Sequence, residues 1–223
     1  MVIIMKKRIT LTEIIFDFLS IAFVFLLPHF GLLAIPFYYI IPVLLFIWIY
    51  LKRTKENFAG IGFSFKKFES KCVIIGAIAA IALFLFIQHI FFPILNKIIY
   101  LKPANLDDFK NIKGHLLNYV FILAAGFVVG GFYEEIVFHG FIFTRLNKII
   151  SGKSALIISF ILTNLLFGLY HIQQGTSGII NAFIAGCAYN VLMIKFNRNL
   201  WYAILFHAFF DAIGLTYIYL GYW

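Results

Sequence analysis

The sequence predicts an all-α protein, a polytopic transmembrane helical bundle of about seven to eight membrane helices. Composition is the first reason, because 63% of the 223 residues are hydrophobic and only 12% are charged. The second reason is the mean hydropathy of +1.00. The third is a series of apolar runs of roughly 20 residues, the length that crosses a lipid hydrocarbon core. Together these observations exclude an ordinary soluble domain.

The predicted membrane helices follow the apolar runs, which cover residues 9–27, 32–51, 72–92, 116–146, 155–172, 179–196 and 200–223. Two prolines, Pro36 and Pro42, are expected to kink the second helix, and Pro93 is expected to end the third. The fourth run is longer than a core of ~30 Å requires, so it is expected to project or bend. Its division into two helices is the alternative that raises the count to about eight.

The basic residues act as topology signals rather than as a nucleic-acid surface. The formal net charge is +9, but the lysines and arginines lie in short clusters between apolar runs. Residues 6–8 precede the first run, and a second cluster lies between residues 52 and 71. On the positive-inside rule both clusters are cytoplasmic, so the N-terminus is expected in the cytoplasm. Cys72 and Cys187 lack the spacing of a disulfide framework or metal motif.

Two adjacent carboxylates, Glu134 and Glu135, interrupt the fourth apolar run. They belong to the segment GGFYEEIVFHG at residues 130–140 and are two of only nine acidic residues in the chain. A carboxylate at hydrocarbon depth costs several kcal/mol unless it is paired, protonated or facing a wet cavity. The pair therefore indicates a functional site, with a position at the membrane interface as the alternative.

Two later runs contain polar partners for this pair. The segment FGLYH places Phe167 and His171 four residues apart, and HAFFD does the same for His207 and Asp211. Residues four apart share a helix face, so three helices are expected to present polar groups to one interior point. His139 follows Glu135 by the same spacing.

A GxxxG pair, Gly126 and Gly130, precedes the carboxylates in the fourth run. Such a pair lets another helix approach the backbone closely. It serves either plain helix packing or the site itself.

These residue types permit hydrolysis of a peptide bond. A carboxylate and an imidazole can activate water, and further polar groups can stabilise the oxyanion that forms. Zinc bound by Glu134, His171 and His207 is an open alternative, although no HExxH helix is present. A serine hydrolase is disfavoured because the chain has no GxSxG motif.

The order EExxxH, FxxxH and HxxxD on successive membrane helices resembles the order EExxxR, FxxxH and HxxxN or HxxxD of the CPBP family of CAAX proteases and bacteriocin-processing enzymes, which includes the type II CAAX prenyl endopeptidases. The resemblance implies one membrane domain over 1–223, with a motif-free three-span region at 1–115 and a catalytic core at 116–223. His139 stands where the family has arginine.

The resemblance also implies roles for the motif residues in a glutamate-dependent endopeptidase, for which we expect no required cofactor, with zinc as the open alternative. Glu134 and His171 would activate water, and His207 and Asp211 would line the oxyanion site. Glu135 would be a supporting carboxylate, with His139 and Phe167 beside it.

The expected partners are the lipid bilayer and a peptide or lipidated-peptide substrate, and no nucleic acid. The substrate would be a bacteriocin or signal-peptide precursor, or a prenylated CAAX-type peptide. Cleavage would occur near the cytoplasmic face of a bacterial plasma membrane, with bacteriocin self-immunity as one role. The alternatives are a non-catalytic immunity or binding protein and an ion-coupled transporter. The sequence leaves the oligomeric state open.

Overall fold

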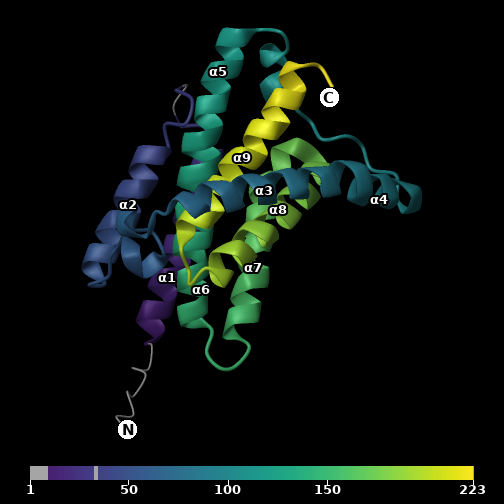
Figure 1. Ribbon diagram of the computed structural model, residues 1–223. Helices are drawn as coiled ribbons and strands as arrows, with labels where there is room; N and C mark the ends of the chain where they lie inside the picture. The colour runs from purple at the N-terminus through teal and green to yellow at the C-terminus, as the bar shows by residue number, and fades with distance from the viewer. Residues whose placement is uncertain (1–9, 33–34, 223) are drawn as a thin grey trace.

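The computed structural model describes residues 10–32 and 35–222, and throughout these ranges the regular structure is helical (Figure 1). The α-helices are α1 (Leu11–Leu26), α2 (Ile40–Arg53), α3 (Ser70–Phe86), α4 (Phe92–Ile98), α5 (Leu116–Ala125), α6 (Phe143–Ile149), α7 (Ala155–Tyr170), α8 (Gly175–Lys195) and α9 (Leu200–Tyr219). The predicted all-α class is therefore confirmed. The basic cluster at residues 6–8 lies outside the described residues.

Five helical segments are long and apolar enough to cross a membrane, which supports a multi-pass membrane protein. They are Leu11–Phe30, Ser70–Ile98, Leu116–Ile149, Ile172–Lys195 and Leu200–Tyr219. Two more helices, α2 with 14 residues and α7 with 16, fall short of the ~20 residues that span a hydrocarbon core. By length alone, the described residues thus contain fewer spans than the seven to eight predicted.

The prolines do not act where they were expected to kink or end helices. Pro42 lies in the first turn of α2, where its missing N–H breaks no helical hydrogen bond, so it marks a helix start. Pro93 does not end the third helix, because the chain continues through it from α3 into α4. A π-helical segment, Ile87–Phe91, precedes this proline, which occupies the first turn of α4.

The Glu pair lies on one continuous helical segment, Leu116–Ile149, of 34 residues. Its division into two helices was therefore the wrong alternative. Between α5 and α6 this segment contains two π-helical stretches, Gly126–Glu134 and Ile136–Ile142. Such wide turns are common at functional sites, since they rotate side chains away from the regular α-helical positions.

Helix α9 packs against this long helix, and α3 runs across α9, with α4 extending beyond it (Figure 1). The approach of α9 is close because a Cβ atom on Gly131 would lie 2.7 Å from the Cβ of Ala208. On α3, a Cβ on Gly76 would lie 3.0 Å from the backbone nitrogen of Phe206. Glycines on both neighbours therefore let α9 occupy the centre of the bundle.

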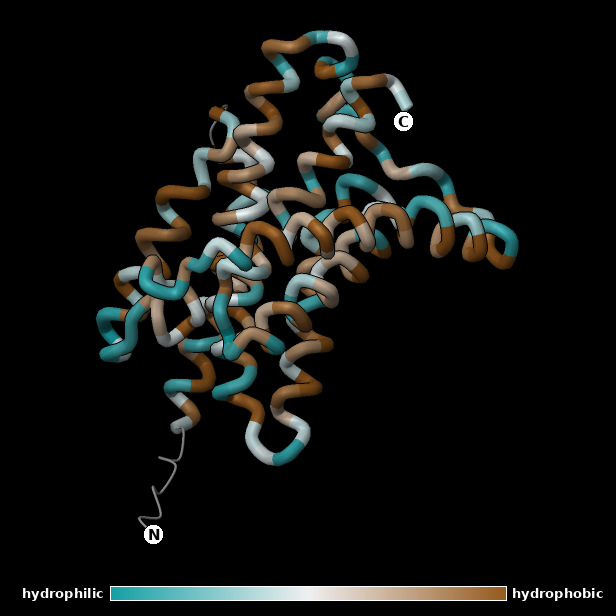
Figure 2. Tube along the Cα trace, in the orientation of Figure 1, coloured by the Kyte–Doolittle hydropathy of each residue, from teal (hydrophilic) through white to brown (hydrophobic). Residues whose placement is uncertain are grey.

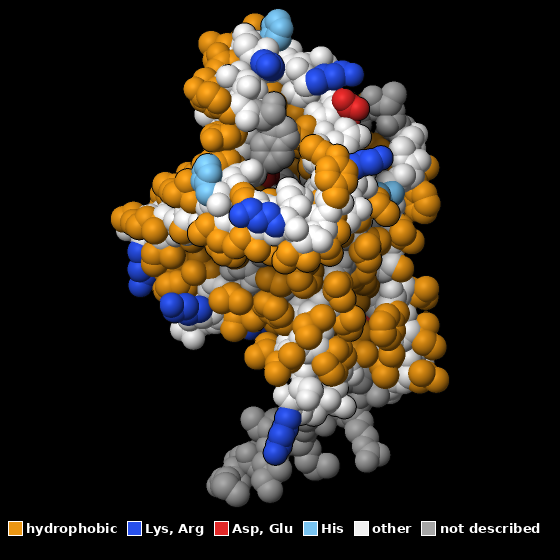
Figure 3. Space-filling model, turned by 90° about the vertical axis from the view of Figure 1, so that its right-hand side faces the viewer, with side chains coloured by type: hydrophobic (Ala, Val, Ile, Leu, Met, Phe, Trp, Pro, Cys, Tyr) orange, Lys and Arg blue, Asp and Glu red, His pale blue; other side chains and the backbone are white. Residues whose placement is uncertain are grey.

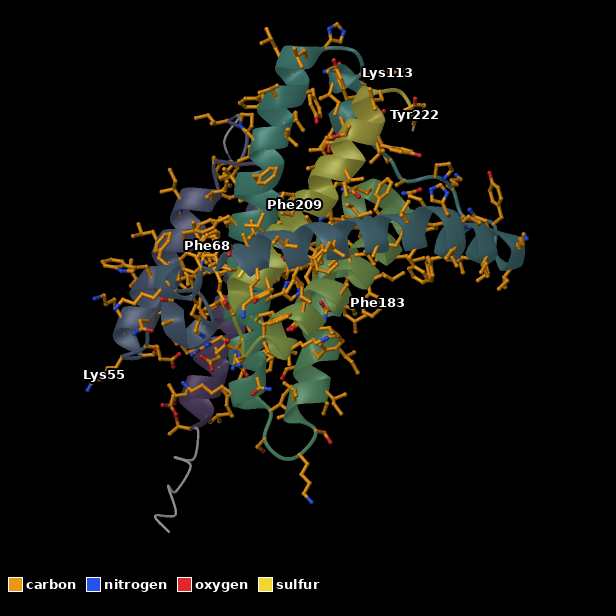
Figure 4. The ribbon with its side chains drawn as sticks, viewed as in Figure 1. Lys55, Phe68, Lys113, Phe183, Phe209 and Tyr222 are labelled. Atoms are coloured by element: carbon orange, nitrogen blue, oxygen red, sulfur yellow. The ribbon has the colours of Figure 1, made fainter. Side chains whose placement is uncertain are left out.

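The hydropathy of the chain matches a lipid environment. Hydrophobic residues follow all the long helices, and hydrophilic ones gather in the connections (Figure 2). Hydrophobic side chains cover most of the face seen in Figure 3, with basic side chains scattered among them. Lys55, in the connection after α2, extends away from the helices (Figure 4).

A buried polar network ties α1 and α2 to α6. The guanidinium of Arg145 is fully buried, hydrogen-bonds the Tyr50 hydroxyl at 3.3 Å, and forms an ion pair with Glu56. Lys148 contacts the same carboxylate at 3.1 Å, and Tyr50 donates to Asp17. Arg145 therefore connects these helices from the interior of the protein.

Candidate active site

Glu135 is the centre of the polar interior. Its side chain has no exposed surface, and each of its oxygens faces a histidine. Oε2 lies 2.6 Å from Nδ1 of His139 on the same helix, and Oε1 lies 2.9 Å from Nδ1 of His207 on α9. One carboxylate therefore joins the long helix to α9.

Glu134 faces the third helix of the predicted constellation. The residue is 8% exposed, and its Oε2 lies 3.8 Å from Nε2 of His171 at the end of α7. Within the described part of the chain, Oε2 has no hydrogen-bond partner. The other ring nitrogen of His171, Nδ1, lies 2.9 Å from the Phe167 carbonyl. Because a carbonyl only accepts, Nδ1 carries the hydrogen, and Nε2 of the neutral ring presents a lone pair toward Glu134.

His207 connects Glu135 to the remaining predicted residue. Its Nε2 lies 3.5 Å from Oδ2 of Asp211, one turn later on α9. The GxxxG pair makes room for this arrangement. A Cβ on Gly130 would overlap Asp211 Oδ2 and would lie 3.3 Å from His207 Nε2. Helix packing and site formation therefore depend on the same glycine.

Phe167 lies among three of the histidines. Its ring centroid is 5.0 Å from that of His171, 5.5 Å from that of His139 and 5.7 Å from that of His207. These contacts, edge-on for His171 and His207 and tilted for His139, help to orient the imidazole rings without supplying a proton. The structure thus brings all seven predicted residues to one place.

Two neighbours of the site were missed by the sequence reasoning. Asn164 Oδ1 lies 3.0 Å from His139 Nε2, and the Tyr189 ring stacks on His207 at 4.6 Å between centroids. Asn164 had a signal, since a buried amide three residues before Phe167 lies near the same face of an apolar helix. Tyr189 had none, because an aromatic residue in an apolar helix is indistinguishable from packing.

A cavity of about 760 Å³ opens beside these residues and is lined by Glu134, His171, His207 and Asp211. Apolar side chains, including Phe84, Phe210 and Leu215, form part of its wall. Among its described lining residues there are three carboxylates, those of Asp108, Glu134 and Asp211, and no lysine or arginine. The cavity therefore combines a polar, acidic centre with an apolar surround.

Zinc bound by Glu134, His171 and His207 stays an open alternative. Over the described ranges, no three His, Cys, Asp or Glu side chains are grouped to hold a metal ion.

Comparison with known proteins shows that part of the chain matches a family model. Residues 116–213 match the family model described as type II CAAX prenyl endopeptidase Rce1-like. No curated protein and no solved structure matches the chain. The matched segment begins with α5 and ends within α9, so it contains the Glu pair and both later motifs.

Proposed function

Since residues 116–213 belong to the Rce1-like type II CAAX prenyl endopeptidase family, which implies an intramembrane protease, we propose that Glu134 and His171 activate the water for peptide hydrolysis. Glu134 is the general base in this proposal, and His171 is its partner. His207 and Asp211 form the oxyanion side of the site.

One observation carries this assignment. Glu134 Oε2 and His171 Nε2 lie 3.8 Å apart on residues that line the cavity, and the Glu134 oxygen has no hydrogen-bond partner among the described residues. Two adjacent acceptors suit a single water molecule, which can donate one O–H to each. Its oxygen lone pair is then free to face a carbonyl carbon.

The reaction proceeds as an addition and an elimination. Glu134 takes a proton from water as the water oxygen bonds to the peptide carbonyl carbon. The carbonyl oxygen becomes an oxyanion, which accepts a hydrogen bond from Nε2–H of His207. The C–N bond then breaks, and the proton held by Glu134 passes to the leaving amine, so that the base is regenerated.

Glu135 and Asp211 support His207 in this scheme. Glu135 accepts from Nδ1–H, and Asp211 Oδ2 lies 3.5 Å from Nε2. Two carboxylates around one imidazole favour its doubly protonated form, which keeps a donor available on Nε2.

The proposed substrate is a peptide segment that enters the cavity from the membrane region. It would belong to a bacteriocin or signal-peptide precursor, or to a prenylated peptide, cleaved near the cytoplasmic face. Self-immunity against a bacteriocin would be one use of this activity. The acidic lining with no lysine or arginine among its described residues favours a neutral or basic segment.

The test compares peptides released by membranes that contain the wild type, Glu134→Gln or Asp107→Asn. Glu134→Gln removes the base with almost no change in size, whereas Asp107 is an exposed carboxylate in the connection between α4 and α5. Specific products should appear with the wild type and Asp107→Asn only. Identical profiles from all three would overturn the proposal and favour the binding-protein or transporter alternatives.

A further inference from the structure

The buried contact between His139 and Asn164 determines where a proton resides beside Glu135. Asn164 Nδ2 lies 2.8 Å from the carbonyl oxygen of Phe160, one turn earlier on α7. A carbonyl only accepts, so the NH2 group must face Phe160, and the amide oxygen must face His139. The reverse amide orientation would set two acceptors against each other.

The orientation of the amide in turn determines the state of His139. Because Asn164 Oδ1 accepts at 3.0 Å, Nε2 of His139 carries a hydrogen. The other nitrogen, Nδ1, lies 2.6 Å from Glu135 Oε2, so this short contact also requires a proton. Glu135 already accepts from His207 through Oε1, which favours the carboxylate over the carboxylic acid. The proton therefore belongs to His139, which is then an imidazolium.

The surroundings keep this arrangement dry and tightly packed. Asn164, His139 and Glu135 all have no exposed surface. Across from them on α8, a Cβ on Gly186 would lie 2.9 Å from Asn164 Oδ1 and 2.6 Å from Phe167 Cδ1. Water thus has no room to replace the amide, and the amide is the acceptor available to Nε2.

We propose that Asn164 is a positioning residue, which holds the hydrogen on His139 Nε2 and so keeps a cation beside Glu135. That cation holds one carboxylate oxygen and leaves the other for Nδ1–H of His207, whose Nε2 then faces the cavity. The catalytic part of this role rests on the proposed hydrolysis, whereas the placement of the proton does not.

The first test is spectroscopic and needs no substrate. The chain has six histidines, so in protein labelled with ¹⁵N-histidine the His139 signals are identified by their loss in His139→Gln. In the wild type both nitrogens of His139 should be protonated at neutral pH. Asn164→Leu, which removes the acceptor, should leave one nitrogen unprotonated. Asn164→Asp, which keeps an acceptor oxygen toward His139 but loses the donor toward the Phe160 carbonyl, should leave both protonated.

Thr163→Val is the matched control. Thr163 is the neighbouring residue on α7, is fully buried, and its Oγ1 has no hydrogen-bond partner in the described part of the chain. This variant changes a buried polar group without touching His139, so the histidine spectrum should stay unchanged. A folded Asn164→Leu protein with the wild-type histidine spectrum would overturn the proposal. An unprotonated ring nitrogen on His139 in the wild type would also overturn it.

The second test measures hydrolysis. Asn164→Leu should lower kcat by about tenfold or more with KM changed by less than about twofold, since the proton arrangement matters in the transition state. Asn164→Asp should retain most of kcat. If no variant, the wild type included, releases product while the spectra behave as expected, the proposed function fails and the proton placement stands. Equal kcat values in active wild-type and Asn164→Leu proteins would overturn the positioning role.

Discussion

At the scale of residues, two neighbouring glutamates have opposite surroundings. Glu135 contacts histidines through both oxygens, whereas Glu134 Oε2 has no hydrogen-bond partner among the described residues. The first carboxylate is therefore saturated and the second is free to act on a ligand. If Glu134 is the general base as proposed, Glu135 contributes mainly to the stability of the site and Glu134 to its activity.

This separation can be measured with two near-isosteric changes. Glu135→Gln places an NH2 group against an imidazole N–H, and we expect a loss of about 1–3 kcal/mol in the free energy of unfolding together with a loss of activity. Glu134→Gln disturbs no protein hydrogen bond at Oε2, so the unfolding free energy should change by less than about 0.5 kcal/mol while activity is lost. Denaturant unfolding in detergent and a peptide-release assay give the two quantities. Equal destabilisation by both changes would contradict the assignment.

At the scale of elements, the site depends on how closely α9 approaches the π-helical part of the long helix. Gly130 faces Asp211 and His207 across this contact, and Gly131 faces Ala208. Through these glycines, the Gly126–Glu134 stretch lets α9 approach its backbone closely, directly before the two carboxylates. The close approach of α9 to these glycines therefore also determines the geometry of the site.

The element-scale prediction concerns Gly130→Ala. The added methyl group would overlap the Asp211 carboxylate, so we expect α9 to shift, kcat to fall by about tenfold or more, and stability to fall by about 1–3 kcal/mol. Gly214→Ala on α9 is the control for stability alone, because a Cβ there meets no atom within 4 Å but borders the cavity. That change should raise the free energy of unfolding by up to about 1 kcal/mol through helix propensity. Full activity of Gly130→Ala would argue against the close approach.

At the scale of the whole molecule, the Glu56–Arg145 pair joins the motif-free N-terminal region to the segment that bears the site. Arg145 lies on α6, and Glu56 lies in the connection after α2. Burial raises the pKa of the Glu56 carboxyl, but the hydrogen bonds and charges of Arg145 and Lys148 outweigh it, so the pKa lies below the usual glutamate value. We propose that residues 1–115 and 116–223 fold as one membrane domain through this contact.

The lowered pKa predicts how stability depends on pH. A carboxyl with a lower pKa in the folded state stabilises the fold fully above its unfolded-state pKa of about 4.3. That contribution is lost as the pH falls through the folded-state pKa. Unfolding free energies measured between pH 7 and pH 3 should thus fall less for Glu56→Gln than for the wild type, with Glu69→Gln, an exposed carboxylate, as the control. Parallel pH profiles for the wild type and Glu56→Gln would contradict this contribution.

The sequence by itself determined the class of the protein and the identity of its motifs. Composition required helices in a lipid environment, because a soluble fold of this size could not bury so large a share of apolar side chains. Spacing placed Phe167 with His171, and His207 with Asp211, because a helix repeats its faces every three to four residues. Composition and spacing are properties of the sequence itself, so they can be determined without knowing which segments pack together.

Only the tertiary structure decided which of these faces meet and what each polar atom contacts. Sequence spacing does not predict the π-helical turns around Glu134, the continuation of the helix through Pro93 or the burial of Arg145. Each of these depends on packing between distant segments. The contact between Asn164 and His139 is of the same kind. Hydrogen bonds are directional over tenths of an ångström, and that precision comes from the close approach of helices rather than from the order of residues along them.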